Sequence, residues 1–242
     1  SLVASLFAMG YSPYYIFLLF KRYAKKMLNV DAIPIINTVG SFMINKRFEV
    51  CGFNSGETIE KAYNKIASDK GIKKIKDIKM PIVIPSVDIN NSQKYIFTNY
   101  PIKNNKNRYI SDIPVGTAVR ASSSFPGIFC PCDFQGHKFL DGGILDNIPV
   151  QEVKKQGADK VIAVNFKADQ IDDNSNFMDI SMRTIDIMGN KISEESLLSS
   201  DFVLTVDTDK AGLLDIEKID SCYNYGYNST MENIDRIKAI FS

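Results

Sequence analysis

The sequence has few of the residues that several common kinds of functional site require. It contains one histidine, His137, and four cysteines, at positions 51, 130, 132 and 222, in 242 residues. Four scattered cysteines are too few for a disulfide scaffold in a chain this long, so we expect buried thiols and a reducing, cytoplasmic setting. Cys130, Cys132 and His137 would supply three ligands to a structural zinc that needs four. The sequence therefore implies no metal and no other cofactor.

The chain also lacks an excess of one charge. Its 29 basic and 28 acidic residues leave a net charge of +1, so no overall field attracts nucleic acid. Basic residues do cluster between Lys21 and Lys26 and again between Lys73 and Lys79. We interpret the second cluster as a solvated surface.

Long apolar runs are missing as well, although apolar residues make up 45% of the chain. A membrane span needs roughly 20 of them in succession, and Gly10 and Pro13 interrupt the one candidate region. The segment from Tyr14 to Lys26 starts aromatic and apolar and ends basic. Two interpretations stay open: a core helix with a basic end, which is the commoner case, or an interfacial helix that lies on anionic lipid.

The periodicity of the apolar residues predicts one α/β domain covering residues 1–242. The run Val161 to Val164 is continuously apolar, which is typical of a strand buried on both faces, and the order strand, helix, strand before it predicts a parallel crossover. Tyr100 to Asp112 is polar and predicts a surface loop, whereas Ser41 to Phe53 has no clear pattern. The expected helices cover residues 1–9, 13–28, 55–67, 114–122, 149–157, 177–192 and 219–237, and the expected strands cover residues 81–87, 95–98, 161–164 and 202–206.

The stretch from Arg120 to Val150 holds the candidate site. Gln135 and Gly136 lie between two apolar runs, which predicts a β-hairpin. Alternation along the second strand places His137, Phe139 and Asp141 on one face. Gly142 and Gly143 follow Asp141 directly, so the backbone can turn away there and leave the carboxylate uncrowded. A bare carboxylate at the end of a strand is typical of a catalytic group in α/β folds.

His137 is a tempting partner for Asp141, because an imidazole could relay a proton to the carboxylate. The two residues are four positions apart in an extended strand, which separates them by roughly 13 Å. That distance excludes a direct relay. We expect His137 on the surface of the hairpin.

Two segments of this stretch resemble a known family. Ala-Ser-Ser-Ser-Phe-Pro-Gly at Ala121 to Gly127 and Asp-Gly-Gly-Ile-Leu-Asp-Asn-Ile-Pro-Val at Asp141 to Val150 are similar to the active-site loop and the Asp-Gly-Gly block of bacterial patatin-like phospholipases. The resemblance covers nearly the whole chain, and Ser1 to Ser12 is similar to the helix that follows the nucleophile elbow of that family. It implies a patatin-like α/β fold in which helices flank a mixed, mainly parallel sheet.

The resemblance also implies a function. Members of that family are serine hydrolases that cleave acyl esters of lipids, as phospholipase A or lysophospholipase enzymes do, with a Ser-Asp dyad. Asp141 would be the general base, and an apolar wall of Phe139 and the loop around Pro126 would raise its pKa from the ordinary value of about 3.9. The residues that would shape the turn and line the pocket are Gly142, Gly143, Ser122, Pro126 and Gly127.

The sequence departs from the family pattern at the nucleophile. The only glycines spaced four apart are Gly52 and Gly56, and the residue midway is Asn54, so no GxSxG motif is present. We expect that the elbow and the oxyanion loop precede Ser1 in a longer protein, that this chain alone is inactive, and that its sheet has an unpaired edge or an apolar groove beside Asp141. The alternative is a relative that lost its nucleophile and binds lipid or protein without catalysis. An ordinary α/β-hydrolase would need a histidine after His137, and none occurs.

Overall fold

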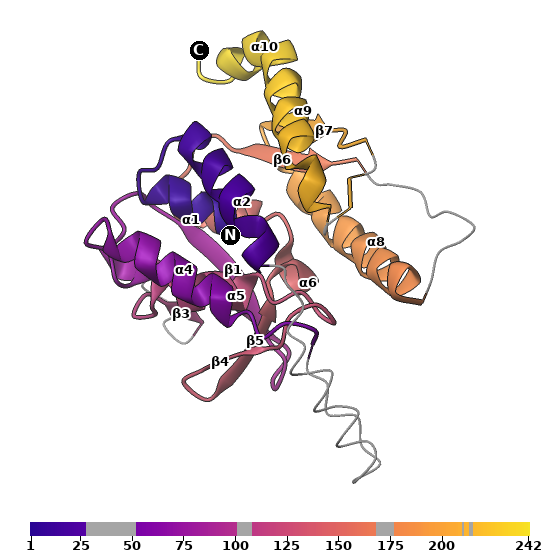
Figure 1. Ribbon diagram of the computed structural model, residues 1–242. Helices are drawn as coiled ribbons and strands as arrows, with labels where there is room; N and C mark the ends of the chain where they lie inside the picture. The colour runs from indigo at the N-terminus through magenta and orange to yellow at the C-terminus, as the bar shows by residue number, and fades with distance from the viewer. Residues whose placement is uncertain (28–51, 101–107, 168–176, 210, 213–214) are drawn as a thin grey trace. The chain divides into compact units, whose positions relative to one another are not determined.

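The structure, a computed structural model, describes residues 1–27, 52–100, 108–167, 177–209, 211–212 and 215–242 (Figure 1). These residues form two compact units, Ser1–Gly143 and Ile144–Ser242, and each is described by itself. The division of the chain into one functional domain stays a prediction. Most of the segment from Ser41 to Phe53 lies outside the described residues.

The helices of the first unit agree with the sequence prediction. Gly10, at φ +82°, ends the first helix, and Gly71, at φ +70°, follows the helix that begins after Gly56. The hydroxyl of Ser12 accepts a hydrogen bond from the Tyr15 backbone N–H at 3.3 Å, at the start of the second helix. The helices are α1 (Leu2–Ala8), α2 (Pro13–Met27), α4 (Glu57–Ser68) and α5 (Val115–Ser122), with a short 3-10 turn at Ile75–Asp77.

The first unit contains a five-stranded mixed sheet. Its order is β3-β2-β1-β5-β4, with β1 at Val83–Asp88, β2 at Gln93–Thr98, β3 at Tyr109–Ile110, β4 at Cys132–Phe134 and β5 at His137–Asp141. β1 runs antiparallel to both β2 and β5, and only β2 and β3 pair in parallel among these strands. The mixed sheet is confirmed, but this sheet is mainly antiparallel rather than mainly parallel.

The hairpin that carries Asp141 forms as the sequence predicts. Gln135 and Gly136 have φ values of +50° and +83°, and two such central residues make the turn that matches the twist of a tight hairpin. β3 was not expected, because Tyr109 and Ile110 lie within a polar segment that predicts a loop. A strand of only two residues is too short for its apolar alternation to be recognised in the sequence.

The second unit holds a parallel pair of strands. β6 (Ile162–Phe166) pairs with β7 (Phe202–Val206), and α8 (Phe177–Leu198) connects them. The sequence predicted a parallel crossover from the strand that ends at Asp141, β5, to β6. This prediction is wrong, because the two strands belong to different sheets. The remaining helices are α6 (Gly143–Asp146), which starts at the last residue of the first unit, α7 (Val150–Lys155), α9 (Ile219–Glu232) and α10 (Ile234–Ala239), with a 3-10 turn at Ile216–Lys218.

One face of β6 is not covered by the part of the chain that the structure describes. Ala163 packs with Val150 and Val161 in a small core, whereas Ile162, Val164 and Phe166 are exposed. The prediction that this strand is buried on both faces is wrong. β6 also has a single partner, β7, among the described strands.

Two further findings concern the cysteines and the helices. Cys130 is disulfide-bonded, so the prediction of a buried thiol is wrong for this residue, while Cys132 and Cys222 are free and Cys132 is buried. Within the described residues, no helix combines the length and the apolar character that crossing a bilayer demands.

Candidate active site

Strand pairing fixes the position of Asp141. The residue stands opposite Ser86 in the β1–β5 ladder, and the hydroxyl of the fully buried Ser86 donates to the Leu140 carbonyl at 2.7 Å. On the other side, the Asp141 backbone N–H donates to the Ser124 carbonyl at 3.0 Å. The end of β5 is thus held from two directions.

The two glycines after Asp141 have different tasks. A Cβ atom on Gly142 would stand 2.3 Å from the Pro85 carbonyl oxygen, so no side chain fits where the chain passes β1. The Gly143 backbone N–H donates to Asp141 Oδ1 at 2.8 Å and opens α6. One glycine permits the turn, and the other supplies the carboxylate with a hydrogen bond.

The environment of Asp141 changes its acidity. Burial raises the pKa of its carboxyl group, and the hydrogen bond from Gly143 lowers the pKa by a smaller amount. The result is a pKa above the ordinary value of 3.8. A carboxylate with a raised pKa is a stronger base, as proton removal from an alcohol requires.

The loop before the hairpin places its residues at different depths. Ser122 and Ser124 are buried, and the Ser124 hydroxyl donates to the Arg120 carbonyl at 2.8 Å. Pro126 is half-buried, and Gly127 is exposed in the left-handed region at φ +83°. The contact with Asp141 comes from the backbone of Ser124, which sequence reasoning had not singled out from the three serines.

The beginning of α1 lies beside this loop. The hydroxyl groups of Ser1 and Ser123 are 2.9 Å apart, and the next residue of the loop, Ser124, accepts the hydrogen bond from the Asp141 backbone N–H. The structure therefore brings together residues that are about 140 positions apart in the sequence. The local sequence around Ser1 does not predict its contact with the loop at Ser123. Only the resemblance to a family could have suggested it.

His137 lies at the edge of the hairpin and has a hydrogen-bond partner that the sequence did not predict. Its Nδ1 atom lies 2.7 Å from Oδ2 of the buried Asp88, and its ring centroid lies 4.8 Å from that of Tyr95 and 5.4 Å from that of Phe139. The side chain keeps 31% of its surface exposed, so the residue lies at the surface of the hairpin as expected, although its ring also packs on β1 and β2. Its hydrogen-bond partner is Asp88 and not Asp141.

Phe139 also differs from its predicted role. Its side chain is completely buried and meets Phe97 and Tyr95 edge to face, at centroid distances of 5.2 Å and 5.4 Å. The residue belongs to the core beneath the site rather than to an open wall. Asp146, the second carboxylate of the block, ends α6.

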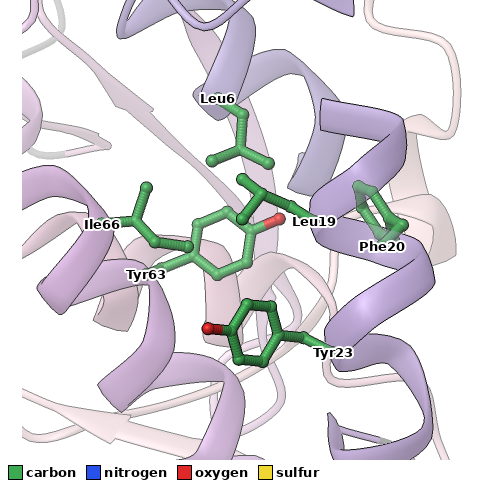
Figure 2. Close-up of a pocket in the computed structure, with 6 residues that line it drawn as sticks. All are labelled: Leu6, Leu19, Phe20, Tyr23, Tyr63 and Ile66. Carbon is green, nitrogen blue, oxygen red and sulfur yellow. The ribbon is translucent and has the colours of Figure 1, made fainter. Parts of the chain in front are cut away.

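A small apolar pocket lies apart from Asp141, between α1, α2 and α4. Figure 2 shows the side chains that converge on it, with Tyr63 at the centre and α2 along one side. The Tyr63 hydroxyl donates to the Leu2 carbonyl at 3.0 Å, which ties this region to the first turn of α1. The lining residues are Leu6, Leu19, Phe20, Tyr23, Tyr63 and Ile66.

Comparison with known proteins agrees with the resemblance seen in the sequence. Residues 1–154 match the family model described as patatin-like phospholipase. The chain is 29% identical over 166 residues to the lysophospholipase NTE1 of Meyerozyma guilliermondii, which is 68% of this chain and 10% of that protein. It is 29% identical over 165 residues to the lysophospholipase NTE1 of Candida albicans, again 68% of the chain and 10% of the relative.

A bacterial relative matches over a shorter stretch. An NTE family protein of Mycobacterium tuberculosis is 28% identical over 105 residues, which is 43% of this chain and 28% of that protein. The matches therefore include fungal as well as bacterial proteins, so the restriction of the resemblance to bacterial members is not supported. The chain spans about a tenth of the length of the fungal relatives.

Proposed function

The chain belongs to the patatin-like phospholipase family, and from this premise we propose that it is the part of a lipid acyl-ester hydrolase that carries the general base, Asp141. The observation that supports this role most directly is the state of the Asp141 carboxyl group. It accepts a hydrogen bond from the Gly143 N–H, and burial raises its pKa. A carboxylate kept for structure alone is usually saturated with donors.

The proposed reaction needs a serine hydroxyl and water besides Asp141. The carboxylate takes the proton of the serine hydroxyl while the serine oxygen attacks the acyl carbonyl carbon. Collapse of the tetrahedral intermediate breaks the ester bond, and the proton passes from Asp141 to the leaving alcohol. Water then attacks the acyl-enzyme, Asp141 takes its proton and returns it to the serine oxygen, and the fatty acid leaves. No histidine takes part.

We place the nucleophile of this dyad in a segment that precedes Ser1 in a longer protein. Support comes from the position of the first residues of α1, since the Ser1 hydroxyl touches Ser123, whose neighbour Ser124 accepts a hydrogen bond from the Asp141 backbone N–H. A residue joined directly to Ser1 would stand close to the carboxylate. Among the described strands β6 pairs only with β7, and its residues Ile162, Val164 and Phe166 are exposed. This is further support, because a parallel strand pair is usually part of a larger sheet.

We propose a phospholipid or lysophospholipid as the substrate, because the fungal relatives are named lysophospholipases. Such a substrate is met in a membrane, and the segment from Tyr14 to Lys26 is the proposed point of peripheral contact. The cytoplasmic location stays a prediction, and the disulfide bond of Cys130 removes one of the premises on which it rested.

The test is hydrolysis of a short-chain p-nitrophenyl ester by the full-length protein that contains this chain. Asp141→Asn keeps the shape of the side chain but removes the base, so kcat/KM should fall by about a thousandfold. Asp133→Asn is the matched control, because this aspartate is exposed on the same hairpin and should leave kcat/KM unchanged. Unchanged activity of Asp141→Asn would remove Asp141 from the mechanism.

The position of the nucleophile has a separate test. The reading frame upstream of the Ser1 codon should encode a GxSxG motif that ends directly before Ser1. Substitution of its serine by alanine should abolish the same ester hydrolysis. An initiator codon at this point, or an active protein without that serine, would contradict the proposed dyad.

A further inference from the structure

The outward face of α2 changes character along the helix. At about 100° per residue, Tyr14, Leu18, Lys21 and Lys25 fall within an arc of roughly 60°. Tyr14 and Leu18 expose 61% and 41% of their surface, and the two lysines are exposed as well. Arg22, Tyr15 and Lys26 lie roughly 40–80° to one side of this arc and are also exposed. We call these seven residues the outer face of α2; its first half is aromatic and apolar, and its second half is basic.

Within the part of the chain that the structure describes, the buried contacts of α2 come from the side opposite to its outer face. The opposite side of the helix already supplies the packing residues, since Ile16 and Ala24 are buried. Leu19, Phe20 and Tyr23 line the pocket against α1 and α4, as Figure 2 shows. A core helix normally carries polar residues on its solvent side, and the exposed aromatic half of α2 does not.

The aromatic half is held in place before any partner arrives. The Tyr15 ring stacks on the Tyr11 ring at 5.3 Å with an interplanar angle of 12°. The Tyr11 hydroxyl donates to the Ile66 carbonyl at 2.9 Å, and Lys70 lies 4.7 Å above the Tyr11 ring. These contacts anchor the start of α2 on α4. A fixed aromatic side chain loses little conformational entropy on binding.

The basic half gives the outer face of α2 a positive charge. Pro13–Met27 contains four basic residues and no acidic one, in a chain whose net charge is only +1. Tyrosine rings prefer the boundary between hydrocarbon and water, and basic side chains next to them are attracted to acidic headgroups. Stable attachment to a bilayer generally takes two such contributions together, and the outer face of α2 contains both.

We infer that the outer face of α2 is a docking surface for a membrane that contains anionic lipid, with Tyr14, Tyr15 and Leu18 at the headgroup boundary and the basic residues on acidic headgroups. The inference rests on the proposed function in one respect, because a lipid substrate gives the docking its purpose. The face itself recognises headgroup charge and not the ester bond. It therefore deepens the proposal by naming the surface from which the substrate is taken.

The experiment measures binding of the full-length protein to vesicles by co-sedimentation. Vesicles of phosphatidylcholine alone are compared with vesicles that also contain phosphatidylserine. We expect binding to the mixed vesicles that weakens as salt is added. The double substitution Lys25→Glu with Lys26→Glu should weaken it by about tenfold or more, and Tyr14→Ser with Leu18→Ser should weaken binding to both kinds of vesicle.

The matched control is Lys73→Glu with Lys79→Glu, the same charge change in the other basic cluster of the first unit, where both lysines are exposed. This variant should bind as the unchanged protein does. Equal losses in the two charge variants, equal binding to both kinds of vesicle, or a preference for lipid that survives both α2 variants would overturn the inference.

A second readout separates this inference from the proposed function. Hydrolysis of the water-soluble p-nitrophenyl ester should be the same in the α2 charge variant and the unchanged protein, whereas Asp141→Asn should lose hydrolysis and keep vesicle binding. Loss of ester hydrolysis in the α2 variant, at an unchanged thermal midpoint, would also count against a docking role. Failure of the Asp141 test alone would leave the docking surface standing.

Discussion

The two ends of the β1–β5 strand pair hold two aspartates in opposite states. At one end, the buried carboxylate of Asp88 accepts hydrogen bonds from His137 and from the backbone N–H groups of Asn90 and Lys138. Burial raises its pKa, but these hydrogen bonds outweigh burial and hold the pKa below the ordinary value. At the other end, Asp141 accepts one backbone hydrogen bond from Gly143, and burial keeps its pKa raised.

The difference teaches how one strand pair separates a structural carboxylate from a reactive one. The carboxylate oxygens of Asp88 accept hydrogen bonds that close the end of the sheet. These bonds lower its pKa, so Asp88 is a weak base. Asp141 is half-buried and has fewer hydrogen-bond donors among the described residues, so it keeps the basicity that the proposed reaction requires. The number of donors around each carboxylate, rather than its burial alone, decides the direction of the pKa shift.

The largest effect on stability is expected from Gly142→Ala at the Asp141 end. The new Cβ atom would meet the Pro85 carbonyl at 2.3 Å, so β1 and the end of β5 must move apart, at a cost of about 3 kcal/mol in the free energy of unfolding. Urea unfolding measures this cost, and ester hydrolysis should fall with it. Gly226→Ala in α9 is the control: its Cβ meets nothing within 4 Å, so it should stabilise by about 0.5–1 kcal/mol. A neutral Gly142→Ala would show that the close approach is not rigid.

At the other end, Asp88→Asn should cost about 2 kcal/mol of unfolding free energy, because it removes the charge that His137 and two backbone N–H groups bind. Ester hydrolysis at saturating substrate should fall far less than in Asp141→Asn. Asp133→Asn, on an exposed ion pair with Lys138, should change stability by less than about 0.5 kcal/mol. If Asp88→Asn abolished hydrolysis while the protein stayed folded, the division of roles between the two ends would be wrong.

A smaller effect is expected from Ser86→Ala between the two ends. The substitution removes the hydrogen bond to the Leu140 carbonyl and should cost about 1 kcal/mol. Its effect should appear in urea unfolding and only weakly in ester hydrolysis, since the ladder and the Ser124 contact still hold Asp141. A loss of hydrolysis as large as that of Asp141→Asn would instead make Ser86 part of the reacting machinery.

The smallest and most specific effect is an opposite pH dependence of stability. The pKa of Asp88 is lowered in the folded protein, so its contribution is present above the unfolded value near 3.8 and is lost as the pH falls through the folded pKa. The pKa of Asp141 is raised, so its ionised form costs stability as the pH rises through the folded value. Asp141→Asn should therefore be more stable than the unchanged protein at neutral pH and equal to it in acid. Unfolding midpoints across the pH range check both signs.

The same raised pKa bears on activity. The proposed base must be ionised, so kcat/KM should fall on the acid side through a pKa above 3.8. An acid limb at or below 3.8 would contradict the raised pKa of Asp141.

Local signals in the sequence predicted the hairpin and the strand end well. Gly136 between two apolar runs favours a tight turn because glycine readily adopts positive φ, and the alternation of β5 sets which residues share a face. The hydrogen-bond partner of His137 could not be predicted, because Asp88 is 49 residues away and no local pattern encodes that pairing. The contact of Ser1 with Ser123 was hidden for the same reason.

The other differences come from misjudged burial and from contacts between distant segments. The run around Val164 is apolar on both faces, but apolar residues show only that a strand tends to be covered, not which face is covered. The short strand β3 and the disulfide bond of Cys130 depend on neighbours that composition does not name. Contacts between distant segments are the part of the fold that a single sequence leaves open.

The close approach of Gly142 to Pro85 has a consequence for directed evolution. A library that randomises the Asp-Gly-Gly tripeptide should return glycine at position 142 among folded clones, whatever activity is selected, because the obstacle is the Pro85 main chain and not a side chain that a second mutation could trim. Position 143 contributes through its N–H group, so proline should be absent there among active clones. The residues recovered at position 142 would therefore show whether the backbone of Pro85 excludes a side chain at the end of the strand.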